Sequence, residues 1–235
     1  MKKKIGVILI LGIVCLIYIN SKYGSIKVIG DVIERNDYIE AIKDISNDNS
    51  NVDDGDLMLV NRGNTLDKDY VPHNLKVVNV KIYPNVSNEE MLMKGNAGDA
   101  LKRLFRKGEE EGIILYALSG YRSYATQKEL YENSIKIRGK GYTYKYVATA
   151  GKSEHQLGLA MDITNAEKST GFENTKEGKW LQENAYKFGF IIRYGKGKED
   201  ITGYNYEPWH VRYVGVENSE KIYSKDITLE EFLEY

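Results

Sequence analysis

Hydrophobic and polar positions divide the chain into three stretches. An apolar run from Ile5 to Ile19 follows three lysines. Residues 21–56 are mixed at first and then become polar and acidic, a composition that buries little surface and is typical of a linker. From Leu57 onward, apolar residues recur at spacings typical of a folded domain. The pattern therefore predicts a membrane segment at 1–20, a linker at 21–56 and one domain at 57–235.

The first stretch has the basic start and apolar core of a membrane-targeting segment. As a helix it would span roughly 22 Å at about 1.5 Å per residue, short of a hydrocarbon layer of about 30 Å unless flanking Lys and Tyr side chains extend it. No small-x-small cleavage site follows the run, and Val14 before Cys15 does not suit a lipoprotein site. We therefore expect an uncleaved single-pass anchor in the cell membrane, with the lysines cytoplasmic and the remainder extracellular. The alternative is a cleaved signal peptide and a secreted domain.

Periodicity within the domain predicts both strands and helices. Strands are expected at 57–60, 77–83, 113–118, 157–163, 190–194 and 209–214. Helices are expected from Ser87 (with Glu90 as a capping box) to about 108–112, from Ser123 to about 137, at 175–188, and from Thr228 (with Glu231) onward. The first of these helices has an apolar stripe formed by Ala97, Ala100, Leu101, Leu104 and Phe105. Because the elements show no regular βαβ alternation, the expected class is α+β, with a small antiparallel sheet flanked by helices.

Composition narrows the function classes. Hydrophobic residues make up 42% of the chain and charged residues 29%, which is ordinary for a globular protein. The formal net charge of -1 argues against a nucleic-acid partner. Nineteen tyrosines against five phenylalanines suit a groove for a polar polymer, or simply an amphipathic surface. The only cysteine is Cys15, so the expected domain has neither a disulfide nor thiolate chemistry.

Two short segments carry the candidate chemistry. In the run 153–163, Asp162 falls on the small-residue face of an alternating strand pattern, downstream of His155. An ionised carboxylate in such surroundings needs a partner, and a metal ion is one. The segment E-P-W-H at 207–210 supplies His210. His155, Asp162 and His210 would form a three-ligand catalytic zinc site with an open position for water.

Glu207 lies three residues before His210 and is not needed as a ligand. A carboxylate beside the open position would serve as general base. The chain has no H-E-x-x-H, which excludes the helix-borne protease arrangement. The competing interpretation is that these histidines are structural or exposed and that Asp162 is a turn residue.

These segments resemble the VanY-type D-alanyl-D-alanine carboxypeptidases, a family that includes LdcB-type L,D-carboxypeptidases. S-E-H-Q-L-G-L-A-M-D matches the family's S-x-H-x-x-G-x-A-x-D, E-P-W-H matches E-x-x-H, and residues 119–123 are similar to its S-G-Y-R-S segment. The similarity extends from about Leu57 to about Tyr223. It implies one zinc ion held by His155, Asp162 and His210, with Glu207 as catalytic base.

The resemblance also implies the substrate, the stem peptide of peptidoglycan, from which a C-terminal D-alanine is removed by D,D- or L,D-cleavage. In that scheme Glu207 takes a proton from the attacking water and returns it to the leaving amine. Arg122 would stabilise the oxyanion or clamp the terminal carboxylate; its alternative role is a structural salt bridge. Gln127 and Ser153 are carried over as substrate contacts.

Several alternatives stay open at this point. A zinc endopeptidase of the cell wall would use the same residues, and a non-catalytic wall-binding module would keep zinc only for structure. Gln156 either contacts substrate or braces its loop, and Arg193 and Tyr194 either line the groove or end a strand. His73 is predicted not to be a ligand.

Overall fold

A four-stranded antiparallel sheet occupies the middle of the computed structural model, which describes residues 55–234. Its strands are β3 (Tyr116–Ser119), β4 (Ala160–Thr164), β5 (Phe190–Ile192) and β6 (His210–Tyr213), and they lie in the order β3-β4-β6-β5. β4 and β6 are therefore the inner strands. The alternation that the sequence shows around 157–163 does form a strand here, beginning at Ala160 because Glu154–Leu157 is a 3-10 turn, η2.

A second sheet holds two short antiparallel strands, β1 (Leu75–Val77) and β2 (Leu92–Lys94). β2 follows the 3-10 turn η1 (Glu89–Met91) and leads directly into α3 (Gly95–Glu110). The predicted capping box is present, since the backbone N–H of Ser87 donates to Glu90 and that of Glu90 donates to the Ser87 hydroxyl, both at 3.3 Å. It starts only η1, however, and the long helix begins eight residues later than predicted from Ser87, because residues 92–94 pair with β1.

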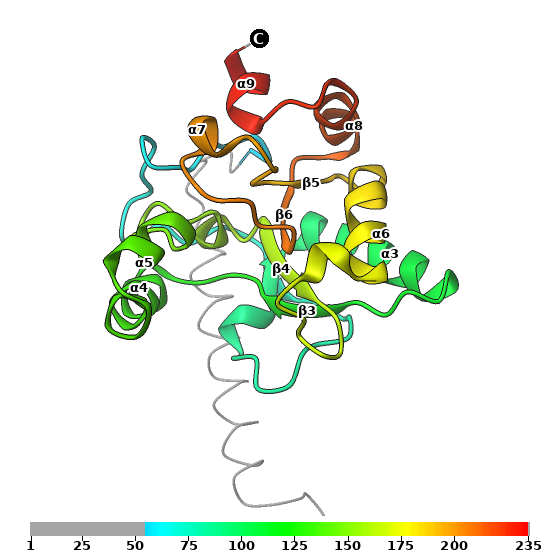
Figure 1. The fold of residues 1–235 in the computed structure, drawn as a ribbon, viewed down its shortest axis with the longest axis horizontal. Helices are drawn as coiled ribbons and strands as arrows, with labels where there is room; N and C mark the ends of the chain where they lie inside the picture. The colour runs from blue at the N-terminus through cyan, green and yellow to red at the C-terminus, as the bar shows by residue number, and fades with distance from the viewer. Residues whose placement is uncertain (1–54, 235) are drawn as a thin grey trace, which may run out of the picture. The chain divides into compact units, whose positions relative to one another are not determined.

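Helices lie around the four-stranded sheet (Figure 1). In that view α4 (Tyr124–Arg138) and α5 (Lys140–Tyr146) are on the left, and α3 and α6 (Lys176–Asn184) are on the right. The remaining elements are η3 (Phe172–Asn174), η4 (Ala185–Phe188), α7 (Glu199–Thr202), α8 (Val216–Lys225) and α9 (Leu229–Glu234). The mixed α and β architecture with small antiparallel sheets confirms the predicted class at that level.

Helix ends follow their capping residues. The Ser123 hydroxyl accepts a hydrogen bond from the backbone of Thr126 at the start of α4, as predicted. Thr228 and Glu231 form a reciprocal pair at the start of α9, with distances of 2.7 and 3.1 Å. These bonds satisfy backbone N–H groups that the first helical turn leaves without partners.

The predicted strand at 77–83 is wrong. β1 ends at Val77, and beyond it Ile82 forms only an isolated bridge with Ala117.

Two further local predictions are wrong. The expected strand at 57–60 is irregular, and the carbonyl groups of Asp56 and Met58 accept hydrogen bonds from the Arg212 side chain instead of a neighbouring strand. The segment after Gly139, for which neither a helix nor a strand is predicted, contains α5, whose Thr143 side chain is fully buried and hydrogen-bonded to Ser134. Tertiary contacts outweigh local preference at both places.

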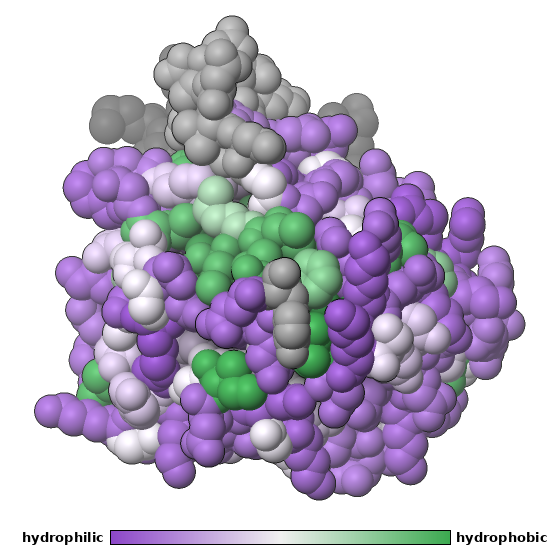
Figure 2. Space-filling model, turned by 90° about the horizontal axis from the view of Figure 1, so that it is seen from above, coloured by the Kyte–Doolittle hydropathy of each residue, from purple (hydrophilic) through white to green (hydrophobic). Residues whose placement is uncertain are grey.

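The core lies between the four-stranded sheet and α3. The whole predicted stripe of α3 is buried, and Leu101, Leu104 and Met161 are fully inaccessible. The face seen from above in Figure 2 is mostly hydrophilic, with one larger hydrophobic area near its centre and smaller separate ones. Among residues 55–234, no helix combines the length and the apolar character needed to cross a membrane. The predicted membrane segment and nearly all of the predicted linker lie outside the described residues.

Candidate metal centre and active site

The strand register brings two of the predicted ligands face to face. Asp162 on β4 is paired directly with His210 on β6. Directly opposed residues of an antiparallel pair project to the same side of the sheet. The His210 Nδ1 atom accordingly lies 3.0 Å from Asp162 Oδ1.

The third predicted ligand comes from η2, just before β4. Gly158 ends this turn in the left-handed conformation (φ 66°), and a Cβ there would approach Leu75 to 2.8 Å. The backbone thus turns sharply between His155 and the strand. His155 Nε2 reaches to 3.6 Å from Asp162 Oδ1.

The resulting cluster fits a zinc ion. One ligand atom from each of His155, Asp162 and His210 lies within 4.8 Å of the others. Ligands at about 2.0–2.2 Å in a tetrahedral zinc site lie about 3.4 Å apart, so small side-chain movements would close this group around the ion. Two imidazoles and one carboxylate are also the donor set of catalytic rather than structural zinc.

Hydrogen bonding orients His155 for this role. Its Nδ1–H donates to the Gly120 carbonyl at 2.6 Å, which leaves the Nε2 lone pair directed at the cluster. Gly120 itself has no room for a side chain, because a Cβ would lie 2.5 Å from the Leu92 carbonyl oxygen. The S-G-Y-R-S segment therefore serves partly to support the first ligand.

Electrostatics differ between the two histidines. Burial, with the positive charge of Arg122, lowers the pKa of His155 to about 4. Burial also opposes protonation of His210, but its contacts with Asp162 and Glu154 outweigh this and raise its pKa to about 9. Burial alone would raise the pKa of Asp162, yet the two imidazoles hold it well below its usual range. A metal that binds His210 must therefore displace a proton.

Glu207 reaches the cluster through a tight turn. The His210 N–H donates to the Glu207 carbonyl at 3.2 Å, with Pro208 and Trp209 between them, so the E-x-x-H spacing is one turn of backbone. Burial is the main cause that raises the pKa of the Glu207 carboxyl to about 8; Asp162 adds to the rise and His210 opposes it. Among residues 55–234, no other side chain forms a hydrogen bond with this carboxyl group.

The three candidate ligands and Glu207 line a cavity of about 160 Å³. Arg122, Gln127 and Ser153 line it too, so the predicted substrate contacts and the predicted metal ligands share one site. Arg122 Nε and Gln127 Oε1 are buried and, among the described residues, have no hydrogen-bond partner. A buried polar atom without a partner is costly, and a bound ligand would supply one.

Of the four other residues that the sequence offered as candidates, one lines the cavity and three do not. Gln156 braces a loop by donating to the carbonyls of Asp67 and Tyr70, at 2.9 and 3.2 Å. Tyr194 lines the cavity. Arg193 points elsewhere, into a buried group of charges. His73 is not part of the metal-ligand cluster that the described residues form.

Sequence reasoning missed several residues of the site. Tyr204, Trp209, Tyr142 and Tyr146 line the cavity. It also missed Glu154, which is buried beside His210 and paired with two arginines. Its position directly before a candidate ligand was the available signal, but a glutamate there is ordinarily expected to face solvent.

Comparison with known proteins agrees with this geometry. A family model described as "VanY: D-alanyl-D-alanine carboxypeptidase" matches residues 90–216. YodJ of Bacillus subtilis is 46% identical over 184 residues, which cover 76% of this chain and 67% of YodJ. A D-alanyl-D-alanine carboxypeptidase of Enterococcus faecalis is 44% identical over 57% of this chain and 52% of its own length. The chain thus spans half to two thirds of these two relatives.

Solved structures give the same result. The LdcB LD-carboxypeptidase superposes with a TM-score of 0.72 at 42% identity, over 79% of this chain and 92% of that one. A variant of the vancomycin-resistance D,D-pentapeptidase VanY, in complex with Zn(II), superposes with a TM-score of 0.64 at 36% identity, over 76% and 98% of the two chains.

Proposed function

Since the chain belongs to the VanY family of D-alanyl-D-alanine carboxypeptidases, we propose that it is a zinc-dependent carboxypeptidase that removes the C-terminal D-alanine from peptidoglycan stem peptides. One observation carries this proposal. Two histidines and one aspartate converge to within 4.8 Å at the wall of a cavity that also holds a buried glutamate and a buried arginine.

Arg122 is proposed to bind the terminal carboxylate of the substrate. Its side chain is only 9% exposed, and its guanidinium group forms no ion pair with another described residue. A planar guanidinium matches a carboxylate with two parallel hydrogen bonds. Recognition of a free chain end favours a carboxypeptidase over an endopeptidase, whose substrate continues past the cleaved bond.

Gln127 and Ser153 are proposed as further contacts to the same peptide. The Gln127 amide nitrogen donates to the Ala148 carbonyl at 2.6 Å, which fixes the side chain, and its Oε1 has no partner among the described residues, so that it can accept from a substrate N–H. Ser153 offers a hydroxyl that either donates or accepts.

Glu207 is proposed as the general base and acid. When bound, zinc supplies Lewis acidity for the scissile carbonyl and for the attacking water. A carboxylate oxygen of Glu207 takes one proton from that water and then delivers it to the nitrogen of the departing D-alanine. The surrounding burial raises the proton affinity of Glu207, which suits a group that must hold a proton between the two transfers.

The deciding experiment uses the purified full chain with synthetic tetrapeptide and pentapeptide stems, followed by mass spectrometry of the products. We expect release of single D-alanine residues, loss of activity after chelation and recovery with zinc. Release from the pentapeptide alone identifies D,D-cleavage, and release from the tetrapeptide identifies L,D-cleavage. Internal fragments, or activity that survives full removal of the metal, would contradict the proposal.

We also propose that residues 1–20 anchor the protein in the cell membrane, that residues 21–56 form a linker, and that residues 57–235 act outside the cell. The support is the basic start and apolar run of the sequence, since the first of these segments lies outside the described residues. Fractionation of cells that express the full chain, with N-terminal sequencing, tests this. A protein that is recovered from the medium without its first residues would show cleavage and secretion instead.

A further inference from the structure

The two ring nitrogens of His210 face different carboxylates. Nδ1 lies 3.0 Å from Asp162 Oδ1, the oxygen that His155 Nε2 also approaches. Nε2 lies on the other side of the ring, 3.5 Å from Glu154 Oε2. Nδ1 is therefore the atom that His210 presents to the metal site.

The atoms on the far side of the ring are without other partners. Among buried side-chain atoms of residues 55–234, both His210 Nε2 and Glu154 Oε2 have no hydrogen bond. A neutral imidazole carries one proton, and if Nδ1 binds a metal that proton is on Nε2. A small closure of the 3.5 Å gap would then give each atom its partner.

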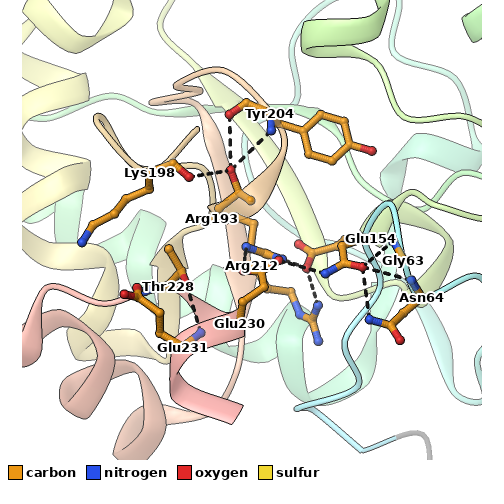
Figure 3. A network of polar contacts seen from close by, with 12 residues as sticks. Gly63, Asn64, Glu154, Arg193, Lys198, Tyr204, Arg212, Thr228, Glu230 and Glu231 are labelled. Atoms are coloured by element: carbon orange, nitrogen blue, oxygen red, sulfur yellow. Dashed lines mark hydrogen bonds and ion pairs between the residues drawn. The ribbon is translucent and has the colours of Figure 1, made fainter. Parts of the chain in front are cut away.

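Glu154 is held in place by an ion network, by which we mean Glu154, Arg193, Arg212 and Glu230 (Figure 3). Glu154 Oε1 accepts from Arg193 Nε at 2.7 Å and from Arg212 Nη1 at 2.8 Å. The other two nitrogens of Arg193 donate to Glu230 on α9, at 2.8 and 2.6 Å. The two negative and two positive charges balance, and none of the four residues is more than 8% exposed.

The two oxygens of the Glu154 carboxylate have different partners. Carboxylates paired with arginine frequently use both oxygens, in two parallel hydrogen bonds. Here one oxygen accepts from both guanidinium groups, and the other is left to face His210. Carboxylates that accept the second N–H of a metal-bound histidine fix its tautomer and its ring orientation.

We propose that Glu154 is a positioning residue for His210. Its Oε2 accepts the Nε2–H of the ring and so commits Nδ1 to the metal, while Arg193 and Arg212 hold the carboxylate at that place. The inference rests on the proposed zinc site, but it concerns metal binding and can be tested without turnover.

The first test is the tautomer of His210 in the unmodified, zinc-loaded protein, read from long-range ¹H–¹⁵N NMR correlations of the imidazole rings. We expect a proton on Nε2 and the metal on Nδ1. The opposite assignment, with Nε2 on the metal, would overturn the proposal.

The second test compares two variants of the ion network by competition for zinc with a chromophoric chelator. Glu154→Gln keeps the size of the side chain, and its amide oxygen stays on the two cationic arginines, so that its NH₂ group faces His210 and cannot accept a proton. We expect zinc affinity to fall roughly ten- to 100-fold. Glu230→Gln is the matched control, because it removes one carboxylate from the same buried network without touching His210, and should change zinc affinity less than about threefold.

Equal losses of zinc affinity in the two variants would mean that the ion network acts only by stabilising the fold. Unchanged zinc affinity in a folded Glu154→Gln protein would refute the proposal. If that variant does not fold, the tautomer measurement decides. Should the protein bind zinc as expected but release no D-alanine from stem peptides, the proposed function fails while this inference stands.

Discussion

The two sides of His210 are built by opposite rules. On the cavity side, Arg122 and Gln127, which line the cavity together with Glu207, carry buried polar atoms that the described residues leave without hydrogen bonds. On the other side, the donors and acceptors of the ion network are paired within the protein, across segments as distant in sequence as Glu154 and Arg212, and the exception is Glu154 Oε2, the oxygen that faces His210.

This difference distinguishes the groups that bind or transform a substrate from the groups that fix a metal ligand in place. Groups that bind or transform a substrate must keep donors or acceptors that have no partner within the protein. These atoms are then available to the ligand. Groups that fix a metal ligand are most useful when only the atom that faces the ligand is left open, because a network of buried charges with many unpaired atoms would be costly. The comparison predicts that variants on the two sides fail in different ways.

The largest effect is expected at Glu207, on the cavity side. Glu207→Gln should lower kcat by about 10²–10⁴-fold, because the amide can neither take nor deliver the proton. Zinc affinity should stay within about twofold of the parent protein, in contrast to Glu154→Gln. Steady-state kinetics and chelator competition measure the two quantities, with Glu129→Gln, an exposed glutamate of α4, as the control. Full turnover in Glu207→Gln would refute its role as base.

A smaller effect is expected at Arg122. Lysine keeps the charge but loses the paired hydrogen bonds, and a charge-assisted bond is worth about 1.5–3 kcal/mol, or roughly ten- to 100-fold in kcat/KM. Stem peptides with an amidated C-terminus sharpen the test. The parent enzyme should reject them, whereas Arg122→Lys should discriminate less between the acid and the amide.

Arg106→Lys on the exposed face of α3 serves as the control for that experiment. Unchanged discrimination in Arg122→Lys would assign the terminal carboxylate to another group of the cavity.

Zinc binding itself should depend on pH. In the metal-free protein the pKa of His210 is raised to about 9, so below that pH the ring carries a proton that zinc must displace. Affinity should therefore rise with pH, by about tenfold per unit between pH about 6 and 8. Chelator competition at several pH values measures the slope. A flat profile would mean that His210 is already neutral and that its contacts with Asp162 and Glu154 do not favour the charged form of the ring.

The smallest effect is expected at the N-terminus of α4, the helix that follows Arg122. Ser123 caps α4, directly after Arg122, and its replacement by alanine should lower the free energy of unfolding by about 1 kcal/mol. Zinc affinity should not change. Thermal and chemical unfolding measure the difference against Ser224→Ala, an exposed control. A loss of zinc affinity in Ser123→Ala would show that the two sides are less separate than the geometry indicates.

Much of the candidate site is readable from the sequence because its signals are local. The alternation around Asp162 predicts its strand, and the three-residue spacing of Glu207 and His210 corresponds to one turn. The apolar stripe of α3 likewise needs only a period of 3.6. The α+β class follows from the same patterns.

What the sequence hides is long-range. Arg193 and Arg212 are almost fully buried, although charged residues are normally expected at the surface. Their shared partner Glu154 lies 39 and 58 residues away along the chain. No local pattern reports such pairing. The irregular segment at 57–60 was missed for the same reason, because a distant arginine takes its carbonyl groups.

β4 has a hydrogen-bonded neighbour along each edge, β3 on one side and β6 on the other. Asp162 therefore lies on a strand whose backbone amide protons should exchange with deuterium only when the whole sheet opens. The distance between Asp162 and His210 is set by that ladder and not by the ion. After the metal is removed, the protein should therefore stay folded and bind zinc again at the rate of a simple binding step.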